Sequence, residues 1–316
     1  MILAKKFCPI YLLTVLALLG CQERAVEIDL RYDGDKLLIT SHLLADAPLE
    51  VYLEHTYKPV GLIPEDPTVS NANVYLIKDG RDTTLLAPAG NGIYVSDLLV
   101  AAGSSYVVRA IAPGYETAQS RPVRVPATGV EVRYNIEKNV CGVFDDRKIY
   151  ALVKVYFNTI RPENEIFVLS LVSVYSDRNI ANILFINDNI VATEESCTAS
   201  YAVRRKGEDP KPGVTLIKGS CMPVPGDPIS ISISTVTSTR VNPGTDSARS
   251  EREPASKLVL RVGKATQSWF DWSRIDNNQP IDIDNWLLTP QKTFTNIENG
   301  YGLVYASNET LIDIAL

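Results

Sequence analysis

The chain has 316 residues, a net charge of −6 and a hydrophobic content of 45%, which allows one large or two medium domains with substantial cores. The acidic balance argues against nucleic acid and against adhesion to anionic lipid, because both require a basic face. Two histidines, 15 tyrosines, 18 glycines and 19 prolines are typical of a β-rich extracytoplasmic protein with many turns.

Residues 1–20 are predicted to be a lipoprotein signal peptide. Lys5 and Lys6 form a short basic region, and an apolar run from Phe7 to Leu19 follows. At about 13 residues this run is too short to span a bilayer, which requires about 20. It leads into Gly20-Cys21, the pattern of a lipoprotein cleavage site, so we expect cleavage before Cys21 and lipid on that cysteine. The alternative is an ordinary signal peptide followed by a chance cysteine.

Residues 21–26 then form a short lipidated tether, and a first domain is expected over residues 27–126. Short apolar runs with turn signals about every 8–12 positions predict a β-sandwich. The hairpin turn Asp79-Gly80 is a strong signal of this kind. The predicted strands are Leu37–Ser41, Leu49–Leu53, Val74–Lys78, Thr83–Leu86, Gly92–Val95, Ser105–Ala110 and Arg121–Val125. The proline-rich loop from His55 to Ser70 is long enough to be functional.

Pro126–Gly129 is interpreted as a domain boundary, and a second β-rich domain is expected over residues 130–316. Its strands are predicted by alternating or continuous apolar runs. These runs are Val130–Ile136, Tyr150–Phe157, Ile166–Tyr175, Ile229–Ser234 and Leu258–Val262. The sequence therefore predicts an all-β protein with two β-sandwich domains.

One short helix is expected near the C-terminus. Thr266 can cap it, and it would run through Ile275, with Trp269, Trp272 and (roughly) Ile275 on one face. We interpret this stretch as a helix packed on the sandwich. The alternative is a carbohydrate-stacking platform, which would need exposed rings.

Three cysteines remain after the signal peptide and the lipidated position. They are Cys141, Cys197 and Cys221, so at least one cannot pair within the chain. Cys197 and Cys221 flank a polar segment, and a bridge between them would stabilise the fold by roughly 3.5 kcal/mol in the chain-entropy model. Three free thiols are the alternative. No Cys/His spacing supports a zinc site.

Four features give the chain a family resemblance. They are Cys21 at the lipoprotein cleavage site, the stretch Val69–Leu76, the Gly90–Tyr94 turn followed by Ala102–Tyr106, and the block Thr295-Asn296-Ile297-Glu298-Asn299-Gly300-Tyr301-Gly302. The chain resembles the family catalogued as domain of unknown function 4249, lipoproteins of Bacteroidota-type bacteria. The closing block is the most specific of the four. The chain departs from the family at one place. The family has an aromatic-rich segment in the second domain, and only Leu184–Asn189 stands near that position here.

The resemblance carries expectations about fold and setting. It implies a first domain similar to immunoglobulin-like or carboxypeptidase-regulatory-like sandwiches. It also implies a gene neighbourhood with TonB-dependent outer-membrane transporters of the SusC type. It supplies no activity that can be carried over to individual residues.

Catalytic signatures are absent from the sequence: it contains no HExxH, GxSxG or phosphate-binding loop. His42 lies in a predicted strand, where a hydrogen-bonded, half-buried ring is expected, and His55 is expected to be exposed to solvent. Asp282 and Asp284 are interpreted as a surface acidic pair, with weak Ca²⁺ binding as the alternative. We therefore predict no catalytic residue, no metal, no cofactor and no enzymatic activity.

We expect an outer-membrane lipoprotein that faces the cell surface and acts as a binding or accessory component beside a TonB-dependent transporter. The periplasmic leaflet is the alternative location. An adhesin or structural lipoprotein, and a carbohydrate-active enzyme, are the alternative functions. Loops on rigid sandwiches carry binding, so the predicted contacts lie in the loop Tyr57–Thr68 and between Cys197 and Cys221. The candidate residues are Tyr57, Lys58, Leu62, Tyr201, Arg204 and Arg205.

Overall fold

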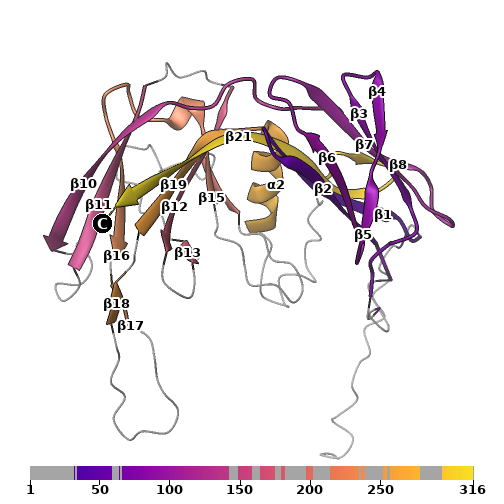
Figure 1. Cartoon of the computed structure of the whole chain (residues 1–316), viewed down its shortest axis with the longest axis horizontal. Coiled ribbons are helices and arrows are strands. Elements are labelled where there is room, and N and C mark those ends of the chain that lie inside the picture. Colours follow the sequence, from indigo (N-terminus) through magenta and orange to yellow (C-terminus); the bar gives the residue numbers. More distant parts are fainter. Residues whose placement is uncertain are drawn as a thin grey trace, which may run out of the picture.

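A computed structural model gives the fold of the chain (Figure 1). The residues that it describes are 32, 34–58, 64, 66–141, 149–158, 164–174, 179–181, 197–201, 214–234, 236–238, 252–254, 257–277 and 294–315. Cys21 and the predicted tether therefore lie outside the described residues. In the part of the chain that is described, no helix is long and apolar enough to cross a membrane.

The N-terminal half is a sandwich of two sheet layers. One layer is part of a large sheet and contains β1 (Leu37–Leu44), β2 (Pro48–His55), β5 (Ala87–Gly90) and β6 (Ile93–Leu99). The other layer contains β3 (Asn73–Lys78), β4 (Asp82–Leu85), β7 (Ser105–Ile111), β8 (Ala118–Ser120) and β9 (Val123–Arg124). Asp79 and Gly80 both have positive φ, as the predicted hairpin turn between β3 and β4 requires.

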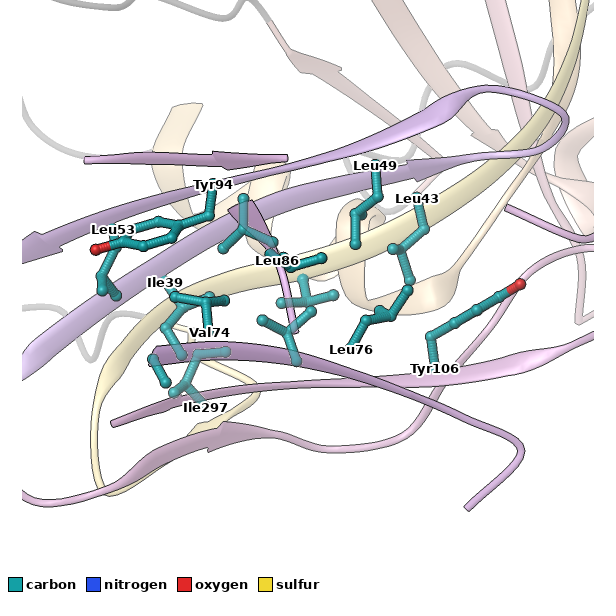
Figure 2. Close-up of a cluster of buried hydrophobic side chains, with 14 of the residues drawn as sticks. Ile39, Leu43, Leu49, Leu53, Val74, Leu76, Leu86, Tyr94, Tyr106 and Ile297 are labelled. Carbon is teal, nitrogen blue, oxygen red and sulfur yellow. The ribbon is translucent and has the colours of Figure 1, made fainter. Parts of the chain in front are cut away.

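The core of this half arises from period-two alternation in its strands. Leu37, Ile39, Ser41 and Leu43 of β1 are buried, while the residues that alternate with them are half-buried on the opposite face. The three apolar side chains pack against Val74 and Leu76 from the other layer. Figure 2 shows this cluster, which also contains Leu53, Tyr94 and Tyr106.

The C-terminal half has a three-layered core. Its part of the large sheet contains β12 (Ile166–Val174), β13 (Asn179–Ala181), β14 (Thr198–Tyr201), β15 (Val214–Lys218) and β19 (Lys257–Ala265). A three-stranded sheet of β10 (Val132–Cys141), β11 (Ile149–Phe157) and β16 (Ile229–Ser234) covers one face, and α2 (Gln267–Asn277) covers the other. The remaining elements are η1 (Gly219–Cys221) and the pair β17 (Val236–Ser238) and β18 (Arg252–Pro254). The all-β class with one short helix near the C-terminus is confirmed.

The last strand joins the two halves into one sheet. β21 (Tyr301–Ala315) runs parallel to β1 from Tyr301 to Ser307 and antiparallel to β19 from Ser307 to Ala315. The large sheet consequently has the order β14-β15-β12-β19-β21-β1-β2-β6-β5, with β13 on β12. In Figure 1, β21 crosses the whole molecule in yellow, with α2 beside its middle.

A second C-terminal strand also belongs to the N-terminal sandwich. β20 (Ile297–Glu298) pairs with β8, and the Ile297 side chain lies in the core that Figure 2 shows. The predicted boundary at Pro126–Gly129 therefore does not separate the hydrogen-bonded sheets. Whether residues 27–126 and 130–316 form independent domains stays a prediction.

Candidate functional site

The first predicted contact loop leaves the sandwich from the end of β2. His55 N–H donates to Pro67 O at 2.9 Å, and Val69 N–H donates to Leu53 O at 3.0 Å, so both ends of the loop are held by backbone bonds. Tyr57 is 41% exposed and Lys58 is exposed. Leu62 lies outside the described residues. The loop ends are thus fixed to a rigid strand, with an aromatic and a cationic side chain open to solvent.

The second predicted contact segment is closed at its base. Cys197 and Cys221 are joined by a disulfide, with their Cα atoms 5.7 Å apart. Lys218 N–H donates to Cys197 O at 3.0 Å, and β14 pairs with β15. Tyr201 pairs through its backbone with Val214. Arg204, Arg205 and the side chain of Tyr201 are not among the described parts of the structure.

A buried polar network lies where β1, β21 and β19 meet. Glu309, with a side chain only 4% exposed, is paired with Arg261 of β19 and accepts a hydrogen bond of 2.5 Å from Ser307 Oγ. His42 Nε2 of β1 lies 2.6 Å from Ser307 Oγ and 3.9 Å from Glu309 Oε1. Side chains from both halves of the molecule therefore share one network.

The local sequence makes room for this network. Gly263 of β19 stands opposite Glu309, and a Cβ at Gly263 would lie 2.8 Å from Glu309 Cγ and 2.4 Å from Asn308 O. Only glycine leaves the space that the Glu309 side chain occupies. His42 could be singled out from the sequence, but its partners could not. Gly263, which directly follows the predicted strand Leu258–Val262, was the available signal, and it became specific only once the β19–β21 register was known.

The order of donors in the network differs from that of an activated serine. Ser307 has one hydroxyl proton, which it donates to Glu309, so the ring N–H of His42 is the donor in the contact with Ser307. A serine nucleophile instead donates its proton to the histidine ring. This arrangement holds the ring in place, as the strand position of His42 predicts.

The rings of His55, Trp269 and Trp272 pack against other parts of the protein. His55 is half-buried rather than exposed as predicted, because its ring lies 6.0 Å from that of Tyr115 and its Nδ1 lies 2.9 Å from Thr56 O. Trp269 is 1% exposed and packs against Tyr305 with ring centroids 4.6 Å apart. This ring belongs to the core beneath α2, as the packed-helix interpretation expects. Trp272 is half-buried beside it.

The helix differs from its prediction in the use of Thr266. Its Oγ1 accepts a hydrogen bond from Ala306 N–H at 3.2 Å and another from Ser268 Oγ at 3.1 Å. Thr266 therefore ties the start of α2 to β21. The buried face of α2 is formed by Trp269, Phe270 and Ser273.

Among the described residues, no group of three or more His, Cys, Asp or Glu side chains could hold a metal ion. Asp282 and Asp284 lie outside those residues, and so does Cys21. The family model described as "Domain of unknown function (DUF4249)" matches residues 23–312. No curated protein matches the chain.

Proposed function

The chain belongs to the family of domain of unknown function 4249, and on that premise we propose that it is an outer-membrane lipoprotein, anchored through Cys21, that acts as a surface-facing accessory of a TonB-dependent transporter. The observation that carries the proposal is the family match over residues 23–312 in a chain with a lipoprotein cleavage site at Cys21. The family resemblance implies the transporter setting.

The geometry of the two predicted contact segments supports a binding role. Both are fixed at their bases, one by backbone bonds to β2 and the other by the Cys197–Cys221 disulfide. The first segment follows β2, and the second includes β14 and β15. All three strands belong to the large sheet. A rigid scaffold lowers the entropy that a loop loses when it binds a partner. Loops held in this way are suited to recognition.

The anchor supports an accessory role for a separate reason. A lipid on Cys21 would confine the protein to the plane of the membrane that holds the transporter. This raises the effective concentration of each partner at the other, so a modest interface is sufficient. The contact would then need only the two predicted contact segments, Tyr57–Thr68 and the one between Cys197 and Cys221.

The test is an affinity pull-down from detergent-solubilised outer membrane, with protease shaving of whole cells in parallel. We expect a TonB-dependent transporter in the eluate and cleavage by the external protease. Tyr57→Ser should reduce the captured transporter, whereas Leu311→Ser, which changes a 67% exposed side chain on β21, should leave it unchanged. An eluate without transporter would remove the accessory role. Protection from shaving would move the protein to the periplasmic leaflet.

A further inference from the structure

Three tyrosines from distant parts of the sequence gather at one end of the N-terminal sandwich. Tyr32 precedes β1, Tyr115 follows β7, and Tyr301 begins β21. We call this region, together with Lys36 and His55, the tyrosine end. All three tyrosines are half-buried, so each is partly open to the surroundings.

The tyrosine end is a connected surface. Lys36 N–H donates to Thr56 Oγ1 at 2.9 Å, and Thr56 N–H donates to Lys36 O at 2.8 Å. Lys36 Nζ lies 5.9 Å from the centre of the Tyr301 ring, and the His55 and Tyr115 rings are 6.0 Å apart. Tyr32 OH donates to Asp35. Burial, and then the negative charge of Asp35, raise the pKa of Tyr115 above its ordinary value, which places the carboxylate of Asp35 near this phenol.

The tyrosine end carries charges of both signs. Asp35 and Glu116 are acidic, whereas Lys36 and Lys58 are basic. Asp66 adds a carboxylate next to Pro67, whose carbonyl accepts a hydrogen bond from His55 N–H. The two lysines can extend their ammonium groups toward anionic headgroups.

The tyrosine end is also where the chain enters the fold. Only residues 22–31 separate Cys21 from Tyr32, and a chain of that length reaches at most ~40 Å. In Figure 1 the indigo start of the ribbon leads directly into β1. A lipid on Cys21 would therefore keep Tyr32 within ~40 Å of the bilayer.

We propose that the tyrosine end rests on the membrane surface, with the phenols of Tyr32, Tyr115 and Tyr301 at the level of the lipid headgroups. The inference rests on the proposed anchor at Cys21 and adds an orientation to it. Tyrosine suits this place because its ring is apolar and its hydroxyl is polar, and lysine can extend its ammonium group to the headgroups. The loop that begins at Tyr57 leaves from the same end, so it would lie close to the membrane beside the transporter.

The experiment is photo-crosslinking in living cells with the full-length protein. p-Benzoylphenylalanine replaces Glu116, an exposed residue next to Tyr115, in one variant and Leu99 in the matched control. Leu99 is 60% exposed and pairs with Pro48 at the opposite end of β2, ~24 Å from His55. We expect several-fold more lipid adduct at position 116 than at position 99, measured by mass spectrometry.

Two other outcomes would overturn the inference. One is an equal yield of lipid adduct at both positions, and the other is a protein adduct in place of lipid at position 116. Membrane fractionation of the two crosslinking variants, with Cys21→Ala alongside, shows whether the orientation or the anchor has failed. If both crosslinking variants are in the membrane fraction and position 116 gives no lipid adduct, only the orientation is wrong. If neither crosslinking variant is in that fraction, the proposed anchor is wrong as well.

Discussion

Asn296 holds the last turn of the chain by both ends of its side-chain amide. Its Nδ2 donates to Val304 O at 2.6 Å, and its Oδ1 accepts from Val304 N–H at 3.0 Å. The residue is only 6% exposed. In the same block, Gly300 and Gly302 lie where a Cβ would meet the carbonyl oxygens of Leu37 and Ile39. The most specific block of the family resemblance is therefore explained by the pairing of β20 with β8 and by the close packing of Gly300 and Gly302 against β1.

Gly302→Ala should destabilise the fold strongly. Gly302 has φ +107°, and a Cβ there would lie 2.1 Å from Ile39 O, a backbone atom of the paired strand. We expect the free energy of unfolding to fall by about 3 kcal/mol in denaturant titration. Gly34→Ala is the matched control, because φ is also positive there but nothing lies within 4 Å of the added Cβ. Its loss should be about 1 kcal/mol, and equal losses would contradict the close-contact explanation.

Glu309→Ala should cost far more stability than Asp313→Ala. Both residues lie on β21 and pair with a cation on β19, Arg261 and Lys257 respectively. The Glu309 side chain is 4% exposed and that of Asp313 is 67% exposed. Removing the buried carboxylate leaves Arg261 without its acidic partner, and this should lower the free energy of unfolding by about 3 kcal/mol. The exposed pair contributes no more than about 0.5 kcal/mol, so similar losses in thermal unfolding would refute the structural role of the network.

The disulfide between Cys197 and Cys221, which links the residue before β14 to the end of η1, should be found in protein taken from its own envelope. Peptide mapping without reductant is expected to recover the linked peptides, because the envelope permits oxidation. Cys197→Ser should lower the free energy of unfolding by roughly 3 kcal/mol, whereas Cys141→Ser should leave the linked peptides in place. Recovery of both cysteines as free thiols would rule out the bridge.

The strands and the helix could be predicted because their signals are local. Alternation in β1 and β11 and the Asp79-Gly80 turn each depend on a few neighbouring residues. The helix Gln267–Asn277 matches the expected span closely. The role of Thr266 was missed, because its partner Ala306 is distant in the sequence and becomes a neighbour only through the β21 pairing.

The pairing of β1 with β21, which joins the two halves of the molecule, could not be predicted. It joins residues near the start of the described chain to residues near its end, and parallel pairing leaves no turn signal in the sequence. The buried network was missed for the same reason, since His42, Arg261 and Glu309 meet only after three distant strands are in register. The family block pointed to the importance of this region, but its role required the fold.

Cutting the linker between the halves should not separate them. A protease site inserted between Ala127 and Thr128, both exposed, would divide the chain into two fragments. We expect the fragments to elute together in native gel filtration, because β20 and β21 pair with β8 and β1 of the N-terminal fragment. Ile297 and Val304 also belong to the N-terminal core. Separate elution of two folded fragments would show that the halves are independent domains.

The proposed lipid on Cys21 can be detected by mass spectrometry of the N-terminal peptide of the mature protein, purified from its own envelope. We expect a peptide that starts at Cys21 and carries acyl chains. The Cys21→Ala variant should lack this peptide and leave the membrane fraction. A mature chain that starts elsewhere, or an unmodified Cys21, would contradict the proposed anchor.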